Sequence, residues 1–166
     1  MCVFMKKHSG RWAITAERRQ INGWSFYCVP EFEKQGIVHG FFTRESPDMF
    51  NENDSRLFRE ICALTDVIVM NQEHGDSVHV IRAGERPVRG DGLVLLERNV
   101  AGIIRTADCM PVIILDPVCP MAAIVHAGWR GTVQKITAKA VEKMVNSGSR
   151  VNQMSALPGP SIRTCC

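Results

Sequence analysis

Two almost uninterrupted apolar runs, Val112–Asp116 and Met121–His126, constrain the fold more than any other feature of the sequence. Each run is predicted to be a β-strand. A strand without polar alternation is typical of a sheet that is covered on both faces. The chain must therefore supply further layers of structure on either side of these two strands.

The remaining pattern predicts several short strands and two helices. Segments rich in apolar, β-branched or aromatic residues predict strands at 24–29, 37–43, 67–70, 78–81, 92–96 and 101–105, with one more short strand after residue 148. Helical periodicity predicts a helix over 55–64, capped by Asp54 or Ser55, and a second over 132–146, stopped near Gly148. Residues 1–23 are expected to be a weakly patterned lead-in to a domain over 24–166. This order predicts an α+β fold with layered sheets and no regular βαβ winding.

Composition excludes several classes of protein. The 166 residues, 45% hydrophobic and 22% charged, are typical of one globular domain. A net charge of +3 is too small for a dedicated nucleic-acid binder. No apolar run has the length of a membrane-spanning helix, and no secretory leader is recognised. The 7 cysteines include no CxxC pair, so we expect reduced thiols and a cytoplasmic protein rather than a disulfide framework.

A strand-to-helix turn with two glycines follows the second apolar run, over His126–Gly131. Backbone N–H groups and a helix N-terminus meet in such a turn, which favours anions. Arg130 adds a guanidinium suited to phosphate or carboxylate. The alternative is a tight turn whose glycines only permit close packing, with Arg130 in solvent. The local sequence favours neither interpretation.

Two other turns carry side chains that could act in chemistry. Cys109 lies between apolar strands, where its thiolate could bind zinc or act as a nucleophile beside His126. Taken alone, Cys109 is better explained as an inert thiol beside a turn-forming Asp108, and His74 as an ordinary loop histidine. Together, one cysteine and two histidines from three turns could supply a catalytic zinc site, which has three protein ligands and an open position that activates water.

Six segments of the chain resemble the YfiH family, whose members are also known as polyphenol oxidases with a laccase domain, peptidoglycan editing factors or purine nucleoside phosphorylases. The resemblance runs from about residue 24 to the end of the chain. Its Ala-Asp-Cys and His-Ala-Gly-Trp-Arg-Gly motifs, in this order and spacing, are highly specific. The six segments are His39–Arg44, Asn71–Gly75, Asp91–Val94, Thr106–Pro111, His126–Gly131 and Gly159–Ile162.

The resemblance implies a layered α/β/β/α fold with mixed sheets and a zinc site. Carried over position by position, the metal ligands are His74, Cys109 and His126. The resemblance also implies phosphorolysis of adenosine, inosine, guanosine or methylthioadenosine, and deamination of adenosine. The expected partners are therefore a purine nucleoside and phosphate, with neither nucleic acid nor membrane. Copper, the metal of the older phenol oxidase label, is the less favoured cofactor because the chain has only 5 histidines.

The resemblance also suggests roles for residues around the metal. Asp108 and Arg130 are the candidate catalytic residues. Arg44, Gln72, Arg130 and Ser161 are the candidate substrate-binding residues. The alternatives are a hydrolase that edits a peptidoglycan precursor through the same zinc site, and an inactive truncated remnant.

The chain departs from the family pattern in two places. Residues 45–47 are Glu-Ser-Pro, where the family has a glycine pair after the threonine and arginine, so the loop beside Arg44 is expected to differ in shape. The family also continues beyond the position of Cys166. We therefore expect the chain to lack the C-terminal part of the domain, including strands of the second sheet.

Overall fold

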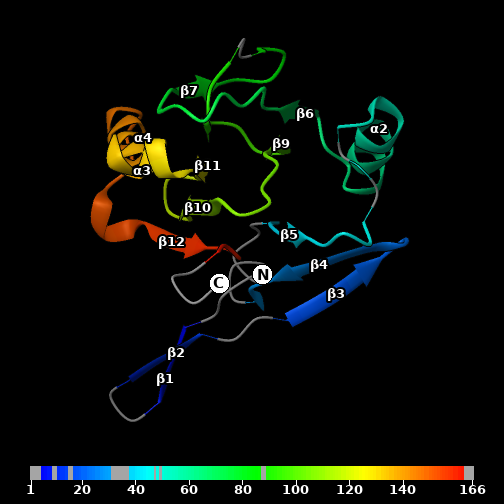
Figure 1. Ribbon diagram of the computed structural model, residues 1–166, viewed down its shortest axis with the longest axis horizontal. Coiled ribbons are helices and arrows are strands. Elements are labelled where there is room, and N and C mark those ends of the chain that lie inside the picture. Colours follow the sequence, from blue (N-terminus) through cyan, green and yellow to red (C-terminus); the bar gives the residue numbers. More distant parts are fainter. Residues whose placement is uncertain are drawn as a thin grey trace.

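The computed structural model describes residues 5–8, 11–14, 17–30, 38–46, 48, 50–86 and 89–162. Short strands far outnumber helices in these residues, as the sequence predicts (Figure 1). The strands are β1 (Met5–His8), β2 (Arg11–Ile14), β3 (Glu17–Ile21), β4 (Trp24–Cys28), β5 (Phe41–Phe42), β6 (Asp66–Val69), β7 (Val78–Ile81), β8 (Gly92–Leu95), β9 (Val100–Ile103), β10 (Met110–Asp116), β11 (Met121–Ala127) and β12 (Ser155–Pro158). The helices are α2 (Glu52–Ile61), α3 (Trp129–Val133), α4 (Ile136–Asn146) and the 3-10 turn η1 (Val151–Gln153).

A five-stranded sheet in the order β12-β10-β11-β8-β7 forms the centre of the domain. Strands β7 and β8 run parallel, whereas the other neighbours are antiparallel, so the sheet is mixed. The two apolar runs of the sequence are β10 and β11, paired with Ile113 opposite Ile124. Every residue of β10 after Met110 is buried, which confirms that this strand is covered on both faces.

Different layers cover the two faces of this sheet. Helix α4 lies against one face, where Ile136, Ala140 and Met144 pack on valines and isoleucines of the strands. On the other face lie β4 and β5 with their phenylalanines, and β6 paired in parallel with β9. Helix α2 is outermost, and its Phe58 stacks on Trp24 of β4. The result is the predicted α+β fold, with layers in the order α/β/β/α (Figure 1).

Both predicted helices begin earlier in the structure than the sequence indicates. Helix α2 begins three residues early because Asn51, not Asp54 or Ser55, is its cap and accepts a hydrogen bond from Asn53 N–H at 2.9 Å. The second predicted helix is two helices, α3 and α4, separated by Lys135, whose φ of 61° is left-handed. The predicted end of this second helix near Gly148 is confirmed, since the chain turns at Gly148 with φ of 108°.

The expected lead-in over residues 1–23 contains three strands. Strands β1 and β2 pair with each other, and β3 pairs with β4, placing Arg19 opposite Phe26. Four of the five residues of β3 are polar or charged, so its sequence carries a weak strand signal, but its partner strand supplies the hydrogen bonds. Of the strand predicted over 37–43, the described residues form only β5, and residue 37 lies outside them. None of the described helices has the length and apolarity to cross a membrane.

Candidate metal centre

The structure brings the three predicted metal ligands together. The ligand atoms of His74, Cys109 and His126 all lie within 4.8 Å of one another. The two imidazole rings meet edge to face, with centroids 4.7 Å apart. A bound metal ion would be contacted by two imidazole nitrogens and a thiolate, a donor set that zinc accepts in proteins.

The pairing of β10 and β11 explains how Cys109 reaches His126. In this antiparallel register Pro111 lies opposite His126, and Met110 lies opposite Ala127. Cys109, the residue just before β10, therefore emerges at the same sheet edge at which β11 ends. His74 comes to this edge from the loop between β6 and β7.

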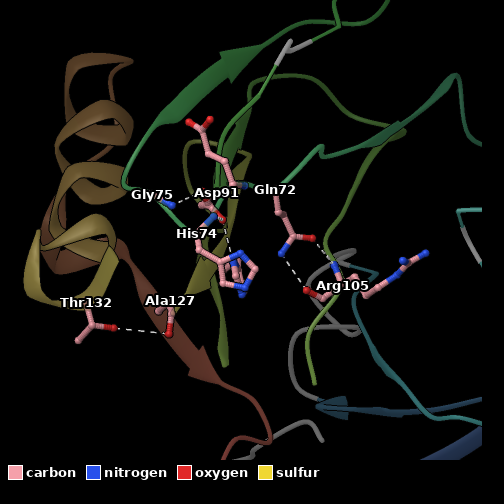
Figure 2. A network of polar contacts seen from close by, with 9 residues as sticks. Gln72, His74, Gly75, Asp91, Arg105, Ala127 and Thr132 are labelled. Atoms are coloured by element: carbon pink, nitrogen blue, oxygen red, sulfur yellow. Dashed lines mark hydrogen bonds and ion pairs between the residues drawn. The ribbon is translucent and has the colours of Figure 1, made fainter. Parts of the chain in front are cut away.

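A buried carboxylate, Asp91, fixes both histidines. Its Oδ1 lies 2.7 Å from His126 Nδ1, and neither side chain is exposed beyond 2%. The same carboxylate accepts the backbone N–H groups of His74 at 3.0 Å and Gly75 at 2.7 Å (Figure 2). Asp91 thus connects the strand that ends in one predicted ligand with the loop that carries another.

The charge of Asp91 also determines how His126 can bind a metal. Burial works to raise the pKa of the Asp91 carboxyl, but hydrogen bonds from His126 and from the backbone outweigh it and hold the pKa below its ordinary value. An ionised Asp91 accepts the proton of His126 Nδ1. The lone pair of Nε2 is then available to a metal, the arrangement that buried histidine ligands commonly use.

The loop that carries His74 adopts an unusual backbone and is held from outside. His74 has a left-handed φ of 58°, which costs energy for a residue with a side chain. Besides Asp91, the neighbouring Asp76 holds the loop through an ion pair with Lys139 of α4. Strained backbone of this kind persists where surrounding contacts determine it, which is common at functional sites.

The two glycines of the turn after His126 permit close packing. A Cβ on Gly128 would lie 3.3 Å from Cys109 Sγ, and a Cβ on Gly131 would lie 2.6 Å from the carbonyl oxygen of Gly75. Arg130 is exposed, with its guanidinium carbon 5.3 Å from the centroid of the Trp129 ring. These contacts support the close-packing interpretation of the turn.

A cleft of about 770 Å³ opens beside the three ligands. Of the predicted catalytic and substrate-binding residues, Asp108 and Gln72 line this cleft. Arg44, Arg130 and Ser161 are not among its lining residues, and their roles stay predictions. The backbone of Asp108 is nevertheless close to Ser161, because its carbonyl oxygen accepts the N–H of the next residue, Ile162, at 3.0 Å. The lining residues are Phe50, Val69, Met70, Asn71, Gln72, His74, Arg105, Thr106, Ala107, Asp108, Cys109 and His126.

The side chain of Gln72 is already engaged. Its Oε1 accepts Arg105 N–H at 2.7 Å, and its Nε2 donates to Arg105 O at 2.8 Å (Figure 2). Gln72 therefore shapes the wall of the cleft by clamping the chain at Arg105. A direct contact of this amide with substrate would require it to share or release these bonds.

Two residues of the site had no role assigned from sequence. Asp91 belongs to the Asp-Gly-Leu-Val segment but looks like a turn residue before a strand, and its burial follows only from the fold. Arg105 precedes the Thr-Ala-Asp-Cys segment and lines the cleft. A charged residue directly preceding a fully apolar strand, as Asp91 does, is the available sequence signal for a buried polar contact.

Comparison with known proteins places this site in a family. The sequence pattern described as multi-copper polyphenol oxidoreductase laccase matches residues 30–166. The chain belongs to this family. The crystal structure of YfiH from Bacillus licheniformis shares the fold, with a TM-score of 0.72 and 25% identity over 90% of this chain and 66% of that one.

Two enzymes of known name are also similar to the chain. A purine nucleoside phosphorylase of Streptomyces coelicolor is 42% identical over 103 residues, which are 60% of this chain and 43% of the enzyme. The adenosine deaminase RL5, from an unknown prokaryotic organism, is 36% identical over 113 residues, which are 62% of this chain and 43% of that protein. The family member described here therefore matches less than half the length of either enzyme.

Proposed function

We propose that this chain carries the zinc site and part of the substrate cleft of a purine nucleoside phosphorylase that also deaminates adenosine. The observation that carries the proposal is the convergence of His74, Cys109 and His126 beside a cleft. The names of the related phosphorylase and deaminase supply the reaction class. The substrates are a purine nucleoside, such as inosine or adenosine, and inorganic phosphate.

The donor set supports zinc over a multi-copper centre. A multi-copper site needs many imidazoles, and the other histidines with described side chains have backbone partners elsewhere. His39 Nε2 accepts Val29 N–H at 2.9 Å, and His79 Nε2 lies 2.6 Å from Arg89 O. Two imidazoles and one thiolate leave a zinc ion with a position for substrate, which is the arrangement of catalytic zinc. Zinc also suits phosphorolysis and deamination because neither reaction transfers electrons to a metal.

Phosphorolysis makes defined demands on the residues of the cleft. A phosphate oxygen forms a bond to the anomeric carbon of the ribose while the bond from that carbon to the purine nitrogen breaks. The base leaves with the bonding electrons and takes up the proton that hydrogen phosphate gives up. When bound, the metal supplies a Lewis acid that polarises a substrate atom. Asp108, exposed at the cleft, is our candidate for moving the proton, and Asp91 holds His126 in its ligating orientation.

The test combines metal content with turnover on the chain purified without added metal. We expect about one zinc per chain and release of hypoxanthine from inosine only when phosphate is present. His74→Ala and Cys109→Ala should abolish both, whereas His79→Ala, a matched histidine outside the group, should retain both. Zinc at full occupancy without turnover of inosine or adenosine would refute the proposed activity, and turnover of a muramyl precursor instead would assign the editing reaction.

A further inference from the structure

Arg105 is the one cation that the described residues contribute to the wall of the cleft. The lining includes one carboxylate, Asp108, and no lysine or second arginine among the residues that the structure describes. Arg44 and Arg130, which the family resemblance suggests for substrate binding, are not among its lining residues. Among the described lining residues, Arg105 is therefore the side chain that can form an ion pair with an anionic ligand in this cleft.

Three contacts hold Arg105 in place before any ligand arrives. Gln72 clamps its backbone through two hydrogen bonds of 2.7 and 2.8 Å. Its guanidinium carbon lies 3.8 Å from the centroid of Phe50, another lining residue. One nitrogen reaches Asp48 Oδ1 at 3.4 Å. A guanidinium held in this way loses less conformational entropy when it binds an anion than a mobile one does.

The donors of Arg105 remain available to a ligand. The contact with Phe50 is a cation–π contact, which needs no hydrogen-bond acceptor, and the described residues accept one hydrogen bond from the guanidinium, at Asp48. The contact with Asp48 is long and exposed, with 62% of the Arg105 side chain accessible. Most of the N–H donors thus have no partner among the described residues, and a planar fork of donors matches the oxygens of phosphate.

Arg105 and His74 both line the cleft, and Figure 2 shows the Arg105 side chain extending away from His74, with Gln72 between them. We propose that Arg105 binds a phosphate oxyanion in the part of the cleft away from His74. This inference rests on the proposed function, because it assumes that the same cleft receives the reactants.

The oxyanion can come from two sources, and kinetics separate them. The first is inorganic phosphate as co-substrate, and the second is a 5′-phosphate on the nucleoside. For the first, Arg105→Ala should raise the KM for phosphate about 10- to 100-fold, as expected for lost charge-assisted hydrogen bonds, and leave the KM for inosine within about twofold. For the second, the variant should lose a preference for inosine 5′-monophosphate over inosine. Arg98→Ala, at an exposed arginine outside the lining, is the control and should change neither.

Direct binding separates this inference from the proposed function. Calorimetric titration with inorganic phosphate alone should show binding to the wild type, about 10- to 100-fold weaker binding to Arg105→Ala, and a smaller loss for Arg105→Lys, which keeps the charge but not the fork. This result would stand even if inosine were not cleaved. Equal phosphate affinity in wild type and Arg105→Ala, or no phosphate binding by the wild type, would overturn the inference.

Discussion

Asp91 Oδ1 lies 2.7 Å from His126 Nδ1 and 3.0 Å from the backbone nitrogen of His74, so one carboxylate oxygen serves two of the three predicted ligands. We expect Asp91→Asn to weaken metal binding by about 10- to 100-fold, because the amide is a poorer acceptor for the histidine proton. Competition with a chromogenic chelator measures the affinity. Asp108→Asn, at an exposed cleft aspartate, should leave it unchanged, and equal losses in the two variants would contradict the role given to Asp91.

Gly131 lies where a side chain would push the loop that carries His74. A Cβ there would meet the carbonyl oxygen of Gly75 at 2.6 Å, which backbone atoms cannot accommodate without moving. Gly131→Ala should therefore lower the free energy of unfolding by about 1–3 kcal/mol and weaken metal binding as well. Urea denaturation and chelator competition measure the two effects. Val133→Ala, at a highly exposed position of the same helix, should change neither, and unaltered metal affinity in the glycine variant would argue that the loop is free to adjust.

The ion pair between Asp76 and Lys139 ties the His74 loop to α4. Lys139→Ala should weaken metal binding by about two- to fivefold, the range that a partly exposed ion pair can supply. The melting temperature should change little. Lys143→Ala, one turn further along the same helix, is the matched control. If both lysine variants bind metal like the wild type, the ion pair between Asp76 and Lys139 does not position the loop.

Asp116 makes the stability of the fold sensitive to acid. Burial works to raise the pKa of its carboxyl, but hydrogen bonds from Ser149 and from backbone N–H groups lower it below the ordinary value. A lowered folded-state pKa means that the stabilisation is complete above the unfolded-state pKa of about 3.9 and is lost as the pH falls toward the folded-state value. We expect urea midpoints to be level near neutral pH and to decline below about pH 4.

Substitution of Asp116 should change the shape of this pH profile. Asp116→Asn should cost about 1–3 kcal/mol at pH 7, since buried donors lose a charged acceptor, and should decline less between pH 5 and pH 3. Asp108→Asn, at an exposed position, should reproduce the wild-type profile. Parallel profiles for Asp116→Asn and wild type would assign the acid sensitivity to other carboxyls, such as Asp66, whose pKa is lowered chiefly by its hydrogen bond with Arg86.

Much of the central sheet is predictable because apolar runs report burial directly. The apolar composition of β10 and β11 predicts both strands. The family motifs predict that His74, Cys109 and His126 belong to one metal site. The cap of α2 is not predictable in the same way. Asn51, Asp54 and Ser55 are all good capping residues, so the local sequence does not decide among them, and the structure uses Asn51.

Other features depend on partners that are distant in the chain. Lys135 adopts a left-handed conformation that lysine does not favour, so the break between α3 and α4 has no local signal. Asp91 resembles a turn residue until His126 is placed beside it. Arg105 resembles a solvated surface charge until Gln72 and Phe50 hold it against the cleft.

The three predicted ligands come from widely separated parts of the chain: a loop, a turn before a strand and the end of a strand. A metal ion shared by them would act as a cross-link that joins these segments in the native state only. Folding and metal binding would then be linked equilibria, and free metal at about 100 times its dissociation constant would add about 2.7 kcal/mol to the stability. The melting temperature of this chain would therefore report the metal supply of its surroundings.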